Sequence, residues 1–291
     1  MLQDLDFGKL DNAFFHQAVQ PQDVVVCVQK GGILLKRDPD DTLVLPTWQQ
    51  VQSWSDSWTH WFDARLQYIF CMQERNYFLW MGESGDCPDS AFSYEQAQGL
   101  RQMQSKEICF AAMTAWHLYT WYAASRWCGR CGSTTIHDEK ERMMRCPSCG
   151  NMIFPRINPA VIIAVTDGER LLLSKYAGRA YTRYALLAGF TEIGETLEET
   201  VAREVMEEVG LKVKNIRYYK SQPWGIAGNI LMGFYCDLDG DDQIHIDEQE
   251  LSMAQWFPRN EIPAKDDGIS LTREMIRTFQ EGKEPKEQKG T

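Results

Sequence analysis

A group of acidic residues at helical spacing is the part of this sequence best suited to chemistry. Glu204, Glu207 and Glu208 lie three and four residues apart, so on a helix their carboxylates project from one face. These carboxylates repel one another unless a cation lies among them, and Mg²⁺ or Mn²⁺ prefers oxygen ligands of this kind. We therefore predict a divalent-metal site on a helix from about residue 196 to 209.

The residues around these glutamates are suited to fixing such a helix beside a tight loop. Arg203 can orient or neutralise part of the negative charge, while Gly189 and Gly194 allow a loop that brings Glu195 close. Gly210 is suited to ending the helix. An apolar side chain recurs every four residues on a neighbouring face, which should hold the helix against a core: Leu197, Val201, Val205 and Val209.

Two Cys-x-x-Cys pairs form a second constellation. Cys128 and Cys131 make one pair and Cys146 and Cys149 the other, a spacing typical of a zinc ribbon with one tetrahedral Zn²⁺. Four sulfur ligands leave no position for water, so this zinc should be structural, one ion per subunit, and not catalytic. The redox alternative needs a single pair at the start of a helix in a βαβ unit, which this stretch lacks.

The composition restricts the class of protein and its partners. The 291 residues are 44% apolar and 24% charged, which is typical of a folded protein with two or three modules. The net charge of −11 disfavours long nucleic acid, although the zinc ribbon is locally basic and leaves RNA 5′ ends open as substrates. Neither a targeting segment nor an apolar run of membrane-spanning length is evident, so we expect a cytoplasmic protein without a membrane partner.

Apolar periodicity divides the chain into four parts. Short alternating apolar runs followed by a helical stretch predict an N-terminal α+β domain over 1–125, and the cysteine-rich stretch forms the zinc ribbon over 126–156. Strands and two helices predict an α/β domain over 157–280. Residues 281–291 have almost nothing apolar to bury, which predicts a disordered tail.

The acidic segment also carries a long spaced pattern, Gly-x5-Glu-x7-Arg-Glu-Val-x-Glu-Glu-x-Gly-Leu, from Gly189 to Leu211. In this pattern the C-terminal module resembles the Nudix hydrolases. The resemblance implies an α/β/α sandwich and the hydrolysis of a nucleoside diphosphate joined to another group. In such a reaction metal ions held by the glutamates would neutralise the pyrophosphate and activate water, and a carboxylate would accept the proton.

The chain is similar to the NADH pyrophosphatase branch of that family in two further features. A zinc ribbon precedes the Gly189–Leu211 pattern, and the segment Ser221-Gln222-Pro223-Trp224 follows it. The resemblance implies Glu250 as a further catalytic and metal-binding carboxylate and the backbone of Ala188 as a metal contact. It implies Phe154 and Phe190 as rings that stack on a base. The remaining substrate contacts implied are Arg101, Gln222, Pro223, Trp224, Gly225, Ile226, Ala227, Gly228, Asn229 and Thr272.

Within that segment the chain departs from its relatives. Family members usually continue with Pro-Phe-Pro-x-Ser, whereas this sequence has Gly225-Ile226-Ala227-Gly228-Asn229, without an aromatic ring and two rigid prolines. We therefore expect a more flexible loop here.

The predicted activity is cleavage of the pyrophosphate bond of NAD(H) to AMP and nicotinamide mononucleotide, with removal of NAD caps from RNA as a related activity. Homodimerisation is implied by the same resemblance. Two alternatives stay open. One is a Nudix hydrolase of ADP-ribose, diadenosine polyphosphates or nucleotide sugars, and the other is a non-enzymatic protein that senses a dinucleotide.

Overall fold

The computed structural model describes residues 1–5, 10–29, 31–40, 42–54, 66–81, 87–102, 105–178, 182–263 and 267–286. Contacts group the chain into two compact units. The first unit comprises Met1, Ile157–Trp224 and Asn229–Thr291, and the second comprises Leu2–Arg156 and Gly225–Gly228.

The first unit is built on a mixed sheet of long strands. The order is β13 (Val213–Trp224), β14 (Asn229–Leu238), β10 (Asn158–Asp167), β11 (Arg170–Tyr176) and β15 (Leu251–Pro258), and β12 (Leu187–Phe190) also pairs with β10. β10 runs parallel to β14 and antiparallel to β11 and β12. β10 is therefore a central strand, and its apolar run AVIIAV is buried throughout.

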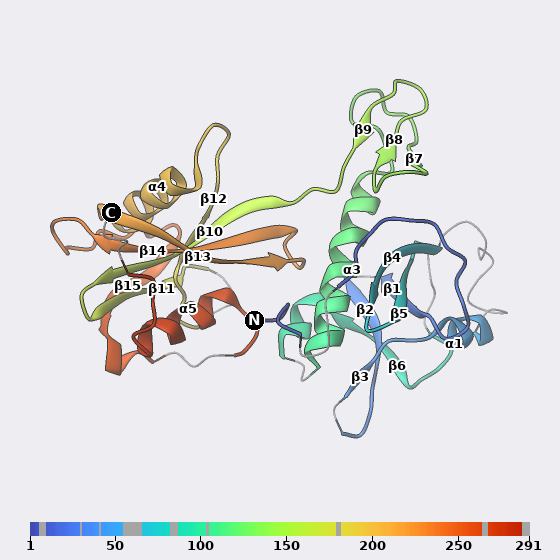
Figure 1. Ribbon diagram of the computed structural model, residues 1–291, viewed down its shortest axis with the longest axis horizontal. Helices are drawn as coiled ribbons and strands as arrows, with labels where there is room; N and C mark the ends of the chain where they lie inside the picture. The colour runs from blue at the N-terminus through green and yellow to red at the C-terminus, as the bar shows by residue number, and fades with distance from the viewer. Residues whose placement is uncertain are drawn as a thin grey trace. The chain divides into compact units, whose positions relative to one another are not determined.

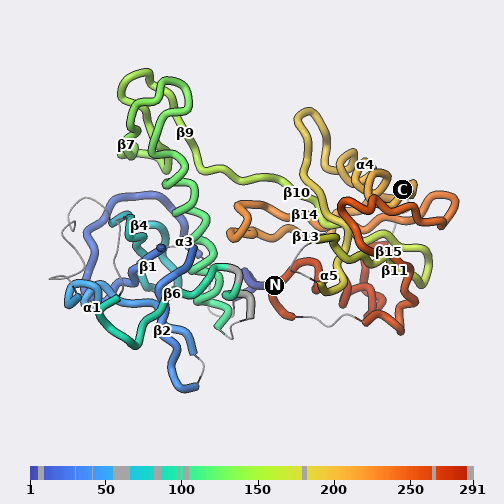
Figure 2. Tube along the Cα trace, turned by 180° about the vertical axis from the view of Figure 1, so that it is seen from behind, coloured from blue at the N-terminus to red at the C-terminus, as the bar shows by residue number. Residues whose placement is uncertain are grey.

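Side chains on β10 alternate between two cores. Val161, Ile163 and Val165 pack with the apolar face of α4 (Leu197–Val209), whereas Ile162 and Ala164 pack with α5 (Leu271–Gln280) on the other face. Figures 1 and 2 show the two helices on opposite faces of the sheet. The fold is thus the predicted sandwich of a sheet between helices.

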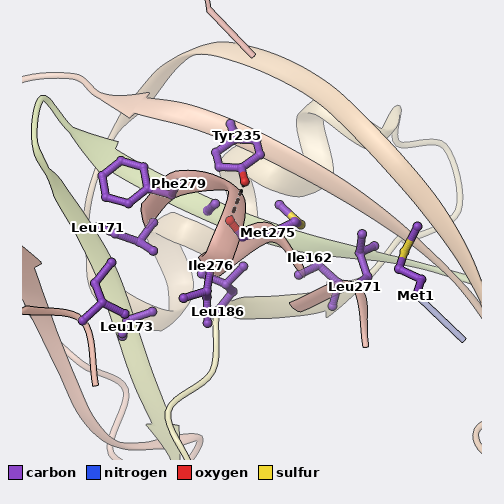
Figure 3. Packing of buried hydrophobic residues seen from close by; sticks show 12 residues of the cluster. Met1, Ile162, Leu171, Leu173, Leu186, Tyr235, Leu271, Met275, Ile276 and Phe279 are labelled. Atoms are coloured by element: carbon purple, nitrogen blue, oxygen red, sulfur yellow. Dashed lines mark hydrogen bonds between the residues drawn. The ribbon is translucent and has the colours of Figure 1, made fainter. Parts of the chain in front are cut away.

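The core beneath α5 contains one polar anchor. The hydroxyl of Tyr235 donates a hydrogen bond of 2.6 Å to the backbone oxygen of Met275, as the dashed line in Figure 3 marks. Leu271, Ile276 and Phe279 from the same helix complete the contact with the sheet (Figure 3). Because a buried phenol needs a partner, this bond fixes both the ring and the helix.

Part of the predicted disordered tail is ordered. Glu284 pairs at 2.8 Å with Arg259, the first residue of the short helix η2 (Arg259–Glu261). The backbone oxygen of Pro285 accepts a hydrogen bond from Arg217. Polar contacts hold these residues, which the apolar composition alone could not reveal. Residues 287–291 lie outside the described part of the chain.

The second unit begins with a six-stranded sheet. Its path is β3 (Leu43–Val44), β2 (Gly32–Arg37), β1 (Val24–Gln29), β5 (Arg75–Trp80) and β4 (Leu66–Met72), with β6 (Phe92–Gln96) paired to β2. The helix α1 (Trp48–Ser53) begins with a capping box at Thr47, and η1 (Ala97–Gln102) leads into α3 (Lys106–Ala124). This is the expected β-rich module followed by helices.

A small three-stranded sheet follows α3 directly (Figure 1). Its strands are β7 (Ile136–His137), β8 (Met144–Arg145) and β9 (Met152–Ile153), in that order. Among the helices of the described ranges, none is long and apolar enough to cross a membrane.

Candidate active site and zinc centre

The acidic helix is formed by strong local signals. Thr196 caps α4 in a capping box with Glu199, and Gly210 ends the helix at φ +70°, a left-handed conformation that favours glycine. The apolar face of α4 is buried as predicted. The turn of residues 191–195 connects α4 to β12, so the Nudix pattern spans strand, loop and helix.

Arg203 is the centre of the loop–helix contact. Its guanidinium donates to both oxygens of Glu195, at 2.6 and 2.9 Å, and to the backbone oxygen of Phe190 at 2.9 Å. It also donates to Glu204 at 2.7 Å and Glu207 at 3.0 Å. The planar guanidinium can serve all these acceptors because its five N–H groups point outward in one plane.

Glu195 and Glu204 respond to this cation differently. The hydrogen bond from Arg203 lowers the pKa of Glu195 to about 2, with further help from the backbone N–H of Glu192 and the hydroxyl of Thr200. The pKa of Glu204 is instead raised, because burial outweighs the effect of Arg203. The nearby charges of Glu207 and Glu250 raise it further.

Gly189 leaves the space that Glu204 uses. A Cβ atom added at Gly189 would lie 1.8 Å from Cδ of Glu204, which no real side chain could tolerate. Only glycine therefore allows β12 to approach the carboxylate this closely. The next residue before it, Ala188, pairs with Ile162 of β10 and fixes this part of the strand in the sheet.

The predicted carboxylates differ in exposure. Glu204 and Glu208 are buried at 9% and 2% relative exposure, whereas Glu207 and Glu250 are exposed. Glu250 lies just before β15, and its backbone oxygen accepts a bond from Ala177. The charge of Glu250 acts on Glu204, so the structure brings the more distant predicted glutamate toward the helix.

The four cysteines of the ribbon converge. Their Sγ atoms lie within 4.8 Å of one another, and the separations are 3.7 Å for Cys128–Cys149 and 3.5 Å for Cys131–Cys146. A tetrahedron with Zn–S bonds of about 2.3 Å requires S–S distances of about 3.8 Å. The thiol positions therefore fit Zn²⁺. Within the described residues, no other such group of potential ligands is this compact.

Each cysteine pair is shaped by the glycine that follows it. Gly132 and Gly150 adopt φ of +75° and +71°, and their N–H groups donate to the backbone oxygens of Cys128 and Cys146. The two turns thus repeat one geometry. In the sequence, the spacing Cys-x-x-Cys-Gly is the signal that could have indicated these turns beside the thiols.

Gln222 lies in the core and not on an open surface. Its side chain is fully buried, with Nε2 donating to the oxygen of Ile269 and Oε1 accepting from the N–H of Leu271, both at 2.7 Å. The amide therefore joins β13 to the start of α5, where Thr272 occupies the second position and is half-buried. Pro223 is exposed and Trp224 half-buried at the end of β13.

The segment that departs from the family forms a hairpin loop. Trp224 pairs with Asn229, and the N–H of Gly228 donates to the oxygen of Gly225 between them. The four loop residues Gly225–Gly228 belong to the second unit. A Cβ atom added at Gly225 would lie 2.2 Å from the backbone oxygen of Met113 in the same unit. Asn229 is buried, and its Oδ1 accepts no hydrogen bond within the described part of the chain.

The predicted stacking rings are both exposed. Phe154 of the second unit has 52% relative exposure and Phe190 of the first unit has 55%. Arg101 lies in η1, and its side chain is outside the described residues. The exposure of two phenylalanines agrees with a role at a surface, since packing alone would bury them.

Family models and relatives match the same two regions. A NUDIX domain matches residues 156–279, and an NADH pyrophosphatase zinc ribbon domain matches residues 123–154. The NAD-capped RNA hydrolase NudC of Erwinia tasmaniensis is 35% identical over 204 residues, which cover 68% of this chain and 76% of that protein. The protein of the same name from Chromobacterium violaceum is 40% identical over 194 residues, covering 66% and 72%.

Among solved structures, a crystal structure of a NUDIX hydrolase from Nitrosomonas europaea has a TM-score of 0.47 and 24% identity. It covers 54% of this chain and 91% of that protein. The family assignment depends instead on the sequence relatives and on the two matched domains. The acidic helix, its loop and the cysteine ribbon therefore identify this chain as a hydrolase that belongs to the Nudix family and carries the NADH pyrophosphatase type of zinc ribbon.

Proposed function

We propose that the chain hydrolyses the pyrophosphate bond of NAD(H), giving AMP and nicotinamide mononucleotide. The observation that carries the proposal is the joint presence of the loop–helix carboxylate arrangement around Arg203 and a four-cysteine ribbon of the NADH pyrophosphatase type. The relatives named NAD-capped RNA hydrolase support the same bond as the target.

The carboxylates fit a divalent cation of the Mg²⁺ or Mn²⁺ class. The donors are hard oxygens, and Gly189 leaves the carboxylate of Glu204 a fitted space against β12. Glu204, Glu207, Glu208 and Glu250, with the backbone oxygen of Ala188, would hold the metal. When bound, the cation would neutralise the pyrophosphate and activate water toward phosphorus.

The other groups of the chain position the reactants. Arg203 joins the loop to the helix and so fixes where Glu204 and Glu207 point. Glu207 is the most accessible of the three helix carboxylates, with a side chain 59% exposed, and we assign it the role of accepting the proton from water. Phe154 and Phe190 would stack on the bases of the dinucleotide.

The loop from Gly225 to Asn229 is assigned to substrate selection. It offers no aromatic ring, so it cannot add a stacking contact where the family has phenylalanine. The Oδ1 of Asn229 is buried without a hydrogen-bond partner among the described residues, so it adds no exposed acceptor in place of that ring. This departure is the reason to test ADP-ribose, diadenosine polyphosphates and nucleotide sugars beside NADH.

Removal of NAD caps from RNA is the same reaction on a substrate in which the ribose of the adenosine is linked to the next nucleotide of an RNA chain.

We place the protein in the cytoplasm as a homodimer. The location is supported by the cysteines, since all nine are free thiols and the ribbon needs reduced sulfur. The dimer is supported by family resemblance.

The test is direct product analysis. The protein is incubated with NADH in H₂¹⁸O with Mg²⁺ or Mn²⁺, and mass spectrometry follows AMP, nicotinamide mononucleotide and the labelled phosphate. AMP formation is expected, with loss of turnover in Glu207→Gln. Release of other products from ADP-ribose or a nucleotide sugar, without AMP from NADH, would replace the proposal with that alternative.

A further inference from the structure

The zinc ribbon has one face that packs and one that does not. Met144 is buried at 4% exposure, and the ring of His137 lies 4.9 Å from that of Tyr122 on α3. His137, Met144 and Ile153 are paired across the three strands and therefore point to one face of the small sheet. That face covers the end of α3.

The opposite face carries large apolar side chains in a row. Ile136 pairs with Arg145, and Arg145 pairs with Met152, so these three side chains share the face away from Met144. Ile136 and Met152 have relative exposures of 52% and 53%. A face of this kind needs an occupant, because large apolar side chains rarely gather on a surface without one.

One aromatic ring extends the row. Trp127, at 62% exposure, pairs with Thr134, which lies two residues before Ile136 on the same extended segment. Because paired residues and side chains two apart on an extended segment share a face, the ring of Trp127 joins the row. We call this set the ribbon stripe: Trp127, Ile136, Arg145 and Met152. The three strands and the segment of Trp127 bridged to them make it about 15 Å wide.

The ribbon is also the basic part of an acidic protein. Residues 126–156 contain six arginines and lysines against three acidic residues, whereas the whole chain has a net charge of −11. Two of the cations are engaged: Arg145 pairs with Asp138 at 3.0 Å, and Arg142 donates to the backbone oxygens of Asn12 and Ile69. The rest are exposed, with no ion pair to any described residue: Arg126, Arg130, Lys140 and Arg156.

An exposed aromatic ring and unpaired arginines within one small domain are a combination that binds single-stranded nucleic acid. Bases of any sequence stack on exposed rings, and arginines contact the phosphates between them. The thiolates leave the zinc centre itself negative, so these individual cations must make the contacts.

We propose that the ribbon stripe binds the single-stranded RNA that follows an NAD cap, with one base stacked on Trp127. The proposal rests on the proposed function, because that function places the NAD cap in the active site. The ribbon stripe would bind the nucleotides that follow the cap. It gives the ribbon a role in binding besides its structural zinc.

The ribbon is mounted firmly enough to serve as such a surface. Arg142 ties it to the backbone oxygens of Asn12 and of Ile69 in β4, and Nε2 of His117 on α3 donates to the oxygen of Arg156 at 2.7 Å. These contacts fix both ends of the ribbon within the second unit. Bases would therefore meet a preformed platform.

The experiment measures binding of an uncapped ten-nucleotide single-stranded RNA to the full-length, zinc-loaded protein by fluorescence anisotropy. Trp127→Ala should weaken binding about tenfold, and Trp127→Phe should restore most of it. Arg130→Glu should weaken binding and lower its salt dependence by about one charge. Tyr218→Ala, which removes an exposed ring from β13, is the matched control and should leave RNA binding unchanged.

Zinc content and turnover of NADH are measured on each variant and should equal those of the wild type. Unchanged RNA affinity in Trp127→Ala would overturn the proposal. A Trp127→Ala protein of smaller size by light scattering would also overturn it, because the stripe would then be a contact between copies. Failure of the wild type to cleave NADH would refute the proposed function while leaving this binding comparison decisive.

Discussion

The carboxylate of Glu204 occupies the space that a side chain at Gly189 would fill. Gly189→Ala would place a methyl group 1.8 Å from Cδ of Glu204 and force the carboxylate or the strand to move. A displacement of about 1 Å at a catalytic group can lower the rate about a hundredfold. We predict at least that loss in kcat for NADH, measured at saturating metal.

The control for this variant is Gly129→Ala. A Cβ at Gly129 meets no atom within 4 Å, so the same substitution there should leave turnover unchanged. Equal activity of Gly189→Ala and wild type would show that Glu204 does not need its present position.

Arg203→Lys is predicted to lower kcat by about ten- to hundredfold, as is usual for residues that orient metal ligands. A lysine ammonium cannot serve Glu195, Glu204 and Glu207 together, since it lacks the planar fork. Arg217→Lys breaks a similar bidentate pair with Asp237, outside the predicted site. That control should alter stability but not kcat, and a metal titration should show weakened metal affinity for Arg203→Lys alone.

The residues that carry the chemistry could be predicted from the sequence more accurately than the elements that support them. The spacing of the glutamates and cysteines predicted α4 and the zinc ribbon, because metal geometry and helical period restrict sequence strongly. The strand β12 could not be predicted, since its four residues are too few for a periodic pattern. The role of Gln222 could not be predicted, because its partners Ile269 and Leu271 are distant in sequence.

Gln222→Leu should destabilise the protein by about 2–4 kcal/mol, because it leaves the oxygen of Ile269 and the N–H of Leu271 buried without their partner. Urea unfolding measures this loss. Exposed Pro223 next to it provides the control, and Pro223→Ala should change stability much less. An unchanged stability of Gln222→Leu together with a raised KM would instead indicate that Gln222 contacts the substrate directly.

Loss of zinc should unfold the ribbon locally. Cys146→Ser removes one of four thiolates that lie within 4.8 Å of one another, and a turn-rich segment has few other contacts to hold it. We expect zinc content to fall to near zero and hydrogen exchange to rise across β7, β8 and β9. Exchange in α4, which packs on its own core, should stay as in the wild type.

The Arg203–Glu195 pair predicts a dependence of stability on pH. The pKa of Glu195 is lowered to about 2 in the folded protein, so folding favours its ionised form. The resulting stabilisation is complete above the ordinary carboxyl pKa of about 4.3 and is lost as the pH falls toward about 2. The difference in unfolding free energy between wild type and Glu195→Gln should therefore be constant near neutral pH and shrink below about pH 4. A difference that stays constant to about pH 3 would contradict this.

The most direct test of the account is the product spectrum from NADH. Wild-type protein with Mg²⁺ or Mn²⁺ should release AMP and reduced nicotinamide mononucleotide in equal amounts, and Glu207→Gln should release neither at a comparable rate. Full turnover by Glu207→Gln, or no AMP from the wild type, would contradict the claim that the carboxylates of α4 cleave the pyrophosphate of NAD(H).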